Sequence, residues 1–180
     1  MGLRPARTHR SPKRPWTRTA RRKVKKAYVR GVPDPRVRSW QMGKAKPEEC
    51  ELQLDLIVTE EVQIRDNALE SARVMANKIF DNKIGRENYF FKIRTYPHQV
   101  LREHSMLSGA GADRLSSGMR LAFGRPVGRA VRAKKNQVIM SIWTMKQYEN
   151  YAMEGMRRAA MKLTGSPKII RKELSKAVAS

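Results

Sequence analysis

The uneven distribution of charge is the feature that most constrains how this chain of 180 residues can fold. Its formal net charge is +23, and residues 1–46 hold 16 Lys and Arg against one acid, Asp34, which leaves a net of +15 in that segment. Five prolines there prevent a long helix, and the apolar residues follow neither a helical nor a strand period. A charge of this size calls for a polyanionic partner. The sequence therefore predicts an extended basic arm over 1–46, followed by a single domain over 47–180.

The basic arm can be read either as a solvated tail or as a segment that becomes ordered on RNA. Most charge runs are solvated tails. Two features favour order on RNA: aromatic residues lie among the arginines, which suits stacking on bases, and 31–35 reads as a stiff turn. The arm residues expected to contact RNA are Arg4, Arg7, Arg10, Lys13, Arg14, Trp16, Arg18, Arg21, Arg22, Lys23, Tyr28, Arg30, Arg36, Arg38 and Trp40.

The rest of the chain carries the patterns of an α+β fold. Strands are expected over 52–58, where apolar residues alternate in a half-buried pattern, and over 88–96, 98–102, 137–145 and 168–174. Amphipathic helices are expected over 67–81, with Asp66 as N-cap, and over 146–163. Two helices against a mixed or antiparallel sheet make a two-layer sandwich. Residues 47–95 are acidic on balance, and we expect them to face away from RNA.

A glycine- and arginine-rich stretch over 102–129 is expected to be a functional loop. Its glycines let the backbone come close to a partner, and its arginines suit phosphate groups. Loops of this length without structure of their own are usually functional or disordered. The arginines expected to contact RNA here and just beyond are Arg114, Arg120, Arg125, Arg129 and Arg132.

Catalytic, metal and membrane signals are weak. The Ser, His and Asp residues of 104–113 are those of hydrolases, but no nucleophile-elbow motif surrounds them. Gly109-Ala-Gly111 is half of a dinucleotide fingerprint and lacks the third glycine. One cysteine and three histidines are too few for an ordinary zinc site, and no apolar run approaches the roughly 20 residues that span a bilayer. We therefore expect no catalytic residue, no metal and no cofactor, and no small-molecule substrate or membrane as partner.

Several motifs carry a family resemblance. In order along nearly the whole chain they are RPAR at 4–7, RGVPDP at 30–35, LSGAGADRL at 107–115, GMR at 118–120 and FGRP at 123–126. Together they resemble the archaeal–eukaryotic large-subunit ribosomal protein family L-ten-e, whose bacterial counterpart is called L-sixteen. Thr8 and His9 stand where the family pattern has Cys-Tyr, and the length favours an archaeal-type member.

The resemblance implies an α+β fold of the hammerhead kind and a structural, non-enzymatic role in the large ribosomal subunit, in the cytoplasm. It implies binding to large-subunit rRNA along the aminoacyl-tRNA corridor near the peptidyl-transferase centre. The partners it implies are this rRNA, tRNA in the A/P region and neighbouring ribosomal proteins. It also implies a loop that points towards the tRNA acceptor ends, made of Arg102, His104, Ser105, Met106, Leu107, Ser108, Gly109, Ala110, Gly111, Ala112 and Asp113.

Two other classes stay open on the residues alone. An enzyme acting on RNA would need a catalytic dyad, a pair of metal-binding carboxylates or a cofactor loop, and none is seen in the sequence. A chromatin-type protein would prefer duplex DNA. The aromatic residues of the arm and the glycines of the loop suit irregular RNA better.

Overall fold

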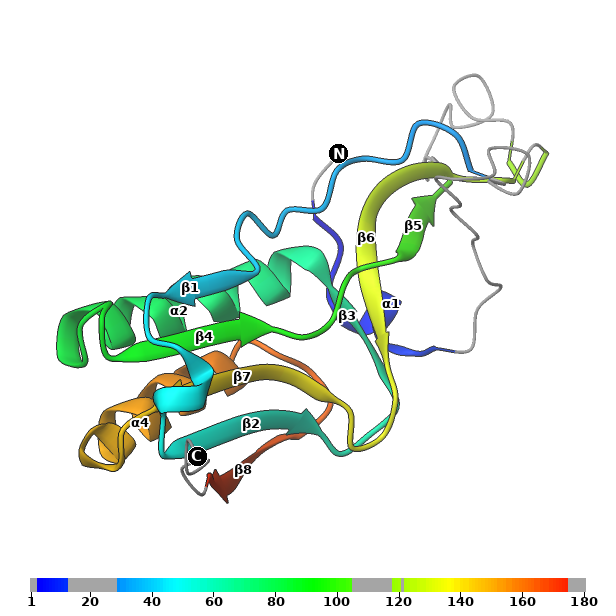
Figure 1. Ribbon diagram of the computed structural model, residues 1–180. Helices are drawn as coiled ribbons and strands as arrows, with labels where there is room; N and C mark the ends of the chain where they lie inside the picture. Colours follow the sequence, from blue (N-terminus) through cyan, green and yellow to red (C-terminus); the bar gives the residue numbers. More distant parts are fainter. Residues whose placement is uncertain (1–2, 13–28, 105–117, 121, 175–180) are drawn as a thin grey trace.

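The computed structural model describes residues 3–12, 29–104, 118–120 and 122–174, which form two antiparallel sheets and two long helices (Figure 1). The larger sheet has the strand order β1 (Gln41–Gly43), β4 (Tyr89–Ile93), β7 (Val138–Thr144), β2 (Leu52–Val58) and β8 (Pro167–Glu173). The smaller sheet has the order β3 (Val62–Arg65), β6 (Arg125–Ala133) and β5 (Gln99–Glu103). The helical elements are α1 (Arg7–Arg10), η2 (Pro47–Glu49), α2 (Asp66–Lys83), η3 (Lys146–Tyr148) and α4 (Glu149–Ala160). The predicted α+β class is confirmed.

Strand β2 lies inside the larger sheet, paired with β7 on one side and β8 on the other. The predicted alternation is only part of the result, because Asp55 and Ile57 are buried as well as the three leucines of the strand. Asp55 accepts hydrogen bonds from Ser141 and Gln53. It also forms an ion pair with Lys172, whose Nζ lies 2.8 Å from Oδ2 of Asp55. Side chains of the two flanking strands thus cover the second face of β2. This burial depends on the neighbouring strands, so the residue pattern along β2 alone cannot predict it.

Helices α2 and α4 pack against each other and against one face of the larger sheet. Their buried residues, such as Leu69 and Phe80 on α2 and Met156 on α4, form the core together with β2, β4 and β7. Gly155 lets the helices approach closely, since a Cβ there would overlap the ring of Phe80. Among the described residues, no helix has both the length and the apolar character needed to cross a membrane.

Helix α2 begins one residue earlier than expected. Asp66 is its first residue, and Arg65 occupies the N-cap position without a side-chain capping bond. The carboxylate of Asp66 instead accepts hydrogen bonds from the backbone N–H groups of Asn67 and Arg36. A carboxylate in the first turn is favoured by the positive end of the helix dipole, which is the physical reason for acidic residues here. The N-cap prediction for Asp66 is therefore wrong by one position.

Of the smaller sheet, only β5 was expected from the sequence, as the strand over 98–102. Strand β3 falls between two predicted elements, and β6 occupies 125–129 of the stretch that we expected to be a loop over 102–129. Arg125 to Arg129 contains a proline and a glycine, both of which weaken a strand pattern. Within the described residues, β3 pairs with 130–133 of β6 only, so Pro126 and Gly128 have a partner strand, β5, on one side alone. A proline is tolerated in a strand segment of this kind, and pairing with β5 overrides the remaining local preferences.

The described parts of the basic arm lie against the body. Residues 3–12 place α1 beside β3, and residues 29–40 run past the smaller sheet and the start of α2 before β1 joins β4 (Figure 1). Val29 and Val37 are buried. The backbone N–H of Ile93 donates to the Trp40 carbonyl at 2.9 Å. The extended form of the whole arm stays a prediction, because 13–28 lies outside the described residues.

Candidate nucleic-acid interface

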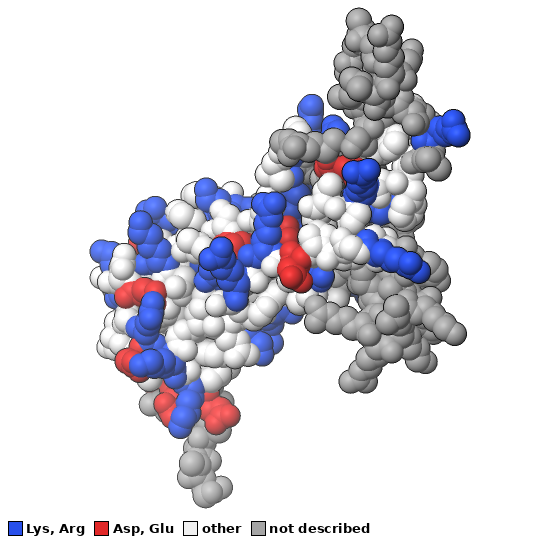
Figure 2. All heavy atoms as spheres, turned by 90° about the horizontal axis from the view of Figure 1, so that it is seen from above, with Lys and Arg blue, Asp and Glu red and all other residues white. Residues whose placement is uncertain are grey.

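The residues expected to contact RNA fall into two groups. Those that lie outside the described residues are Lys13, Arg14, Trp16, Arg18, Arg21, Arg22, Lys23, Tyr28 and Arg114, together with 105–113 of the predicted loop. The described ones come from the arm, from α1 and from the smaller sheet with its flanks. In the view from above, Lys and Arg side chains extend along the molecule, with acidic side chains between them (Figure 2).

Several predicted arginines have exposed side chains. They are Arg7, Arg30, Arg36, Arg38, Arg120 and Arg125. Two of them are held by their backbone: the Arg36 N–H donates to Asp66, and the Arg38 N–H donates to Glu70 at 3.3 Å. These bonds fix the path of the arm along the start of α2 while both guanidinium groups stay in solvent. Such groups can pair with phosphate and release counterions.

Several acids of 47–95, which we expect to face away from RNA, contact the arm. Arg10 pairs with Glu60 at 2.7 Å. Glu70 is itself held by two hydrogen bonds from Arg73, and these bonds lower the pKa of Glu70. Part of the negative charge of 47–95 therefore positions basic residues.

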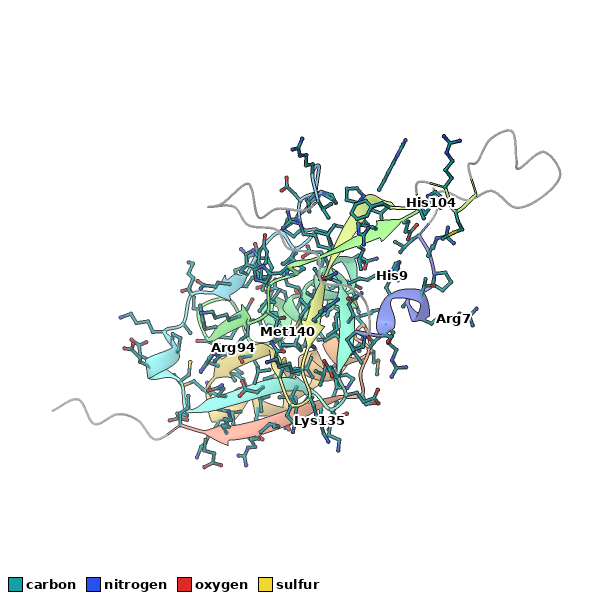
Figure 3. All side chains as sticks on the ribbon, turned by 90° about the vertical axis from the view of Figure 1, so that its right-hand side faces the viewer. Arg7, His9, Arg94, His104, Lys135 and Met140 are labelled. Carbon is teal, nitrogen blue, oxygen red and sulfur yellow. The ribbon has the colours of Figure 1, made fainter. Side chains whose placement is uncertain are left out.

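His9 anchors the first described segment, and sequence reasoning missed it. Its side chain is buried, and its Nε2 lies 3.2 Å from Oε1 of Glu103, whose other oxygen accepts a bond from Arg4. Gln63 donates to the His9 carbonyl at 2.9 Å. In Figure 3, Arg7 points away from the body, whereas His9 lies nearer the strands. The only sign of this in the sequence was that Thr8 and His9 stand where the family pattern has Cys-Tyr.

Arg129 and Arg132 differ from the exposed arginines. Arg129 is 8% exposed, and its guanidinium donates to the Pro33 carbonyl at 2.7 Å and to the Tyr96 hydroxyl at 3.2 Å. Arg132 is half-buried, and burial lowers its pKa although Glu61 opposes the shift. Arg129 therefore clamps the arm to the smaller sheet. The phosphate contacts expected of Arg129 and Arg132 stay predictions.

An aromatic row lies beside this clamp. Trp40 stacks on Tyr96 with ring centroids 5.1 Å apart, and Tyr96 contacts His98 at 4.6 Å. One face of the indole is therefore used within the protein, while the residue as a whole stays half-buried. Its expected contact with a base stays a prediction. Tyr96 and His98 are additions that the sequence did not single out.

The two flanks of the predicted tRNA-facing loop are held together. The guanidinium of Arg102 lies 3.9 Å from the ring centroid of Phe123, and the His104 Nε2 lies 2.6 Å from the Gly118 carbonyl oxygen. Gly124 is required here, since a Cβ would lie 2.5 Å from the carbonyl carbon of Glu103. The base of the loop is thus fixed at the end of β5 and β6.

The side chains gathered at this interface are basic or form hydrogen bonds. No group of three or more metal-binding side chains occurs in the described parts of the chain.

Comparison with known proteins decides the family. The family model described as ribosomal protein L16p/L10e matches residues 16–170. The chain belongs to this family. Similar proteins named large ribosomal subunit protein uL16 occur in Archaeoglobus fulgidus, with 48% identity over 94% of this chain and 93% of the relative, and in Methanococcus aeolicus, with 46% identity over 94% of both. A third, from Staphylothermus marinus, is 45% identical over 97% of this chain and 96% of the relative.

Membership in the L16p/L10e family confirms the resemblance seen in the motifs. It makes the chain a structural ribosomal protein rather than an enzyme, found in the cytoplasm as part of the ribosome. The exposed arginines and the fixed loop base are then features of a protein that works within a ribonucleoprotein. The hypothesis of an RNA-processing enzyme and the hypothesis of a chromatin protein are both set aside.

Proposed function

We propose that this chain binds large-subunit rRNA and helps to shape the aminoacyl-tRNA corridor near the peptidyl-transferase centre. The observation that carries the proposal is family membership over nearly the whole chain, with relatives named as large-subunit proteins. Exposed guanidinium groups along the arm would neutralise phosphates, and half-buried aromatic side chains would pack against bases or riboses. Its effect on translation is positional, through the fold of rRNA, with no chemical step of its own.

The loop over 102–113 is proposed to lie towards the tRNA acceptor ends. Its flanks support this role, because Arg102 on Phe123 and His104 on Gly118 give the loop a fixed base. The base lies at the far end of the smaller sheet, away from α4 (Figure 1). Neighbouring ribosomal proteins and tRNA are the further partners in this proposal.

Co-sedimentation tests membership in the large subunit. The tagged full chain is run through a gradient of cell lysate at moderate and then high salt. We expect it in the large-subunit and whole-ribosome peaks at both. Release into the free pool at moderate salt would show only loose attachment to RNA and would contradict the proposal.

Removal of 105–113 tests the loop. Glu103 must be kept, because it holds Arg4 and His9. We expect the shortened chain to fold and to enter the large subunit as the full chain does. Ribosomes that contain it should translate more slowly, because the loop no longer helps to shape the tRNA corridor. The control replaces Glu103 by Gln, which should weaken the docking of 3–12 and lower the unfolding free energy. Normal translation by ribosomes that contain the shortened chain would contradict the role of the loop.

A further inference from the structure

The larger sheet has an outer face, on the side away from α2 and α4, that carries basic side chains outside the arm and the loop. In Figure 1 both long helices lie behind this sheet. Across β4, β7, β2 and β8, the strand registers form one line of directly opposed residues, which are Lys92, Ser141, Asp55 and Ile170. Directly opposed residues share a face, so this line defines the outer face.

Two rows of cations border the outer face. Lys92 and Arg94 form the row at β4, and Lys168 and Lys172 form the row on β8. Arg94 follows β4 and donates through Nε to Oγ of Ser141 at 2.8 Å, which keeps it on this face. Strands β7 and β2 lie between the rows, so the rows are about 14 Å apart, three strand spacings.

Most of the charge in these rows is unmatched. Lys172 neutralises the buried Asp55, but the other three cations form no ion pair with an acid of the described residues. The two exposed acids of η2 lie before the start of β2, whereas these three cations lie level with its middle and its end. Glu60 and Glu61, which follow β2, interact with arginines of α1 and β6. The face therefore suits a polyanion.

The aromatic side chains of this face are engaged within the protein. The guanidinium of Arg94 lies 5.0 Å from the ring centroid of Trp143, and Phe90 contacts the same ring at 5.5 Å. Trp143 is 7% exposed. Proteins that bind single strands stack bases on exposed rings. The outer face instead presents positive charge, which suits phosphates better than unpaired bases.

An A-form RNA duplex has the matching shape, because its two phosphate backbones border a wide and shallow minor groove. We propose that the outer face binds a double-helical segment of rRNA across this groove. Lys92 and Arg94 meet one phosphate backbone, and Lys168 meets the other. The inference rests on the proposed binding of rRNA and adds a second surface, separate from the arm and the loop.

The experiment compares paired with unpaired RNA on the purified full chain. An RNA duplex of one helical turn and one of its separate strands are titrated over a series of salt concentrations, and NMR follows the backbone amides of the sheet. We expect the duplex to bind more tightly than the single strand and to shift the amide signals of β4 and β8.

Matched variants locate the contact. Lys92→Gln combined with Lys168→Gln should reduce the slope of log affinity for the duplex against log salt by up to about 1.8, which is about 0.9 for each lost phosphate contact. The other two cations of the rows are kept, because they hold Ser141 and Asp55. The control combines Lys83→Gln with Arg157→Gln, exposed on α2 and α4, and should leave the slope nearly unchanged. Circular dichroism establishes that each variant is folded.

The outcomes are distinct. An equal slope for the two double variants would mean that the outer face does not bind RNA, and its lysines on the edge strand β8 would then only prevent pairing with other chains. Equal affinity for the single strand, with the same amide shifts, would overturn the assignment to a duplex. Failure of the duplex and of folded rRNA fragments to bind the native chain would contradict the proposed function itself. In a density map of the large subunit, a neighbouring protein on this face would overturn the assignment to RNA.

Discussion

At the scale of single residues, some arginines of this chain are exposed and can meet phosphate, whereas others are buried and hold the fold together. Arg125 is exposed at the start of β6, whereas Arg129, four residues on, is buried against Pro33 and Tyr96. Both stood alike in the sequence as phosphate ligands. The exposure of each guanidinium in the folded chain decides which one can reach RNA.

Replacing Arg129 by Ala should lower the free energy of unfolding by about 2 kcal/mol, because two hydrogen bonds from a charged group are removed and the Pro33 carbonyl is left without its donor. Urea denaturation measures the change. Arg125→Gln is the matched control and should leave stability within about 0.5 kcal/mol, as surface changes usually do. Equal stability of the two variants would mean that Arg129 does not clamp the arm.

Asp55 should make stability depend on pH. Burial raises its pKa, but hydrogen bonds from Lys172, Ser141 and Gln53 outweigh this, so the pKa lies below its ordinary value of 3.8. A carboxylate with a lowered pKa stabilises the folded chain at pH values above that ordinary value, and the contribution is lost as the pH falls through the folded-state pKa.

Asp55→Asn removes this contribution. The gap in unfolding free energy between the native chain and the variant should be full above about pH 5 and should shrink towards about pH 2. Urea denaturation over this range measures it. Glu154→Gln, which breaks an exposed pair with Arg158 on α4, should give a small gap that hardly changes with pH. A constant gap for Asp55→Asn would contradict the assignment.

At the scale of elements, the packing of α2 on α4 depends on one missing side chain. Gly155→Ala would favour the helix by about 1 kcal/mol from propensity alone. The added Cβ would overlap Phe80, however, and we expect a net loss of about 1–3 kcal/mol. Thermal or urea unfolding measures it, with Asn150→Ala on the exposed side of α4 as control.

A double-mutant cycle identifies the cause of this loss. In a Phe80→Leu background the smaller side chain leaves room, so Gly155→Ala should cost less than in the native chain. An equal cost in both backgrounds would mean that the strain does not come from the Phe80 ring.

At the scale of the whole molecule, the acids of the body fix where the described parts of the basic arm run. Asp66 and Glu70 hold the backbone at Arg36 and Arg38, and Glu60 and Glu103 hold the segment around α1. These acids bind backbone N–H groups and a few side chains, while the side chains of Arg36 and Arg38 stay exposed. A strongly basic protein can in this way keep a defined shape while it presents charge to RNA.

The salt dependence of RNA binding tests this division. Replacing both Arg36 and Arg38 by Gln should reduce the slope of log affinity against log salt by about 0.7–0.9 for each phosphate that the variant no longer neutralises. The control replaces Arg157 and Lys83, which are also exposed, on the outer sides of α4 and α2. If the control variant reduces the slope as much, RNA binding would depend on the total charge and not on the position of Arg36 and Arg38.

The sequence by itself determined the family, the α+β class, the strand at 52–58 and both long helices, because alternation, helical spacing and specific motifs are local properties of the chain. It also indicated a basic surface, since charge is read directly from composition. It did not predict strands β3 and β6 of the smaller sheet or the anchoring of His9. Nor did it contain the burial of Arg129 or the two rows of cations on the outer face of the larger sheet.

Only the tertiary structure decided these features, because each depends on residues far apart in the chain. Strand β6 forms because β5 pairs with its first half, which contains a proline and a glycine, and β3 pairs with its second half. Lys92 and Lys168 come to the same face only because β7 and β2 pair between their strands. Local pattern sets which elements form, and packing between distant segments sets which side chains meet and which remain free to bind.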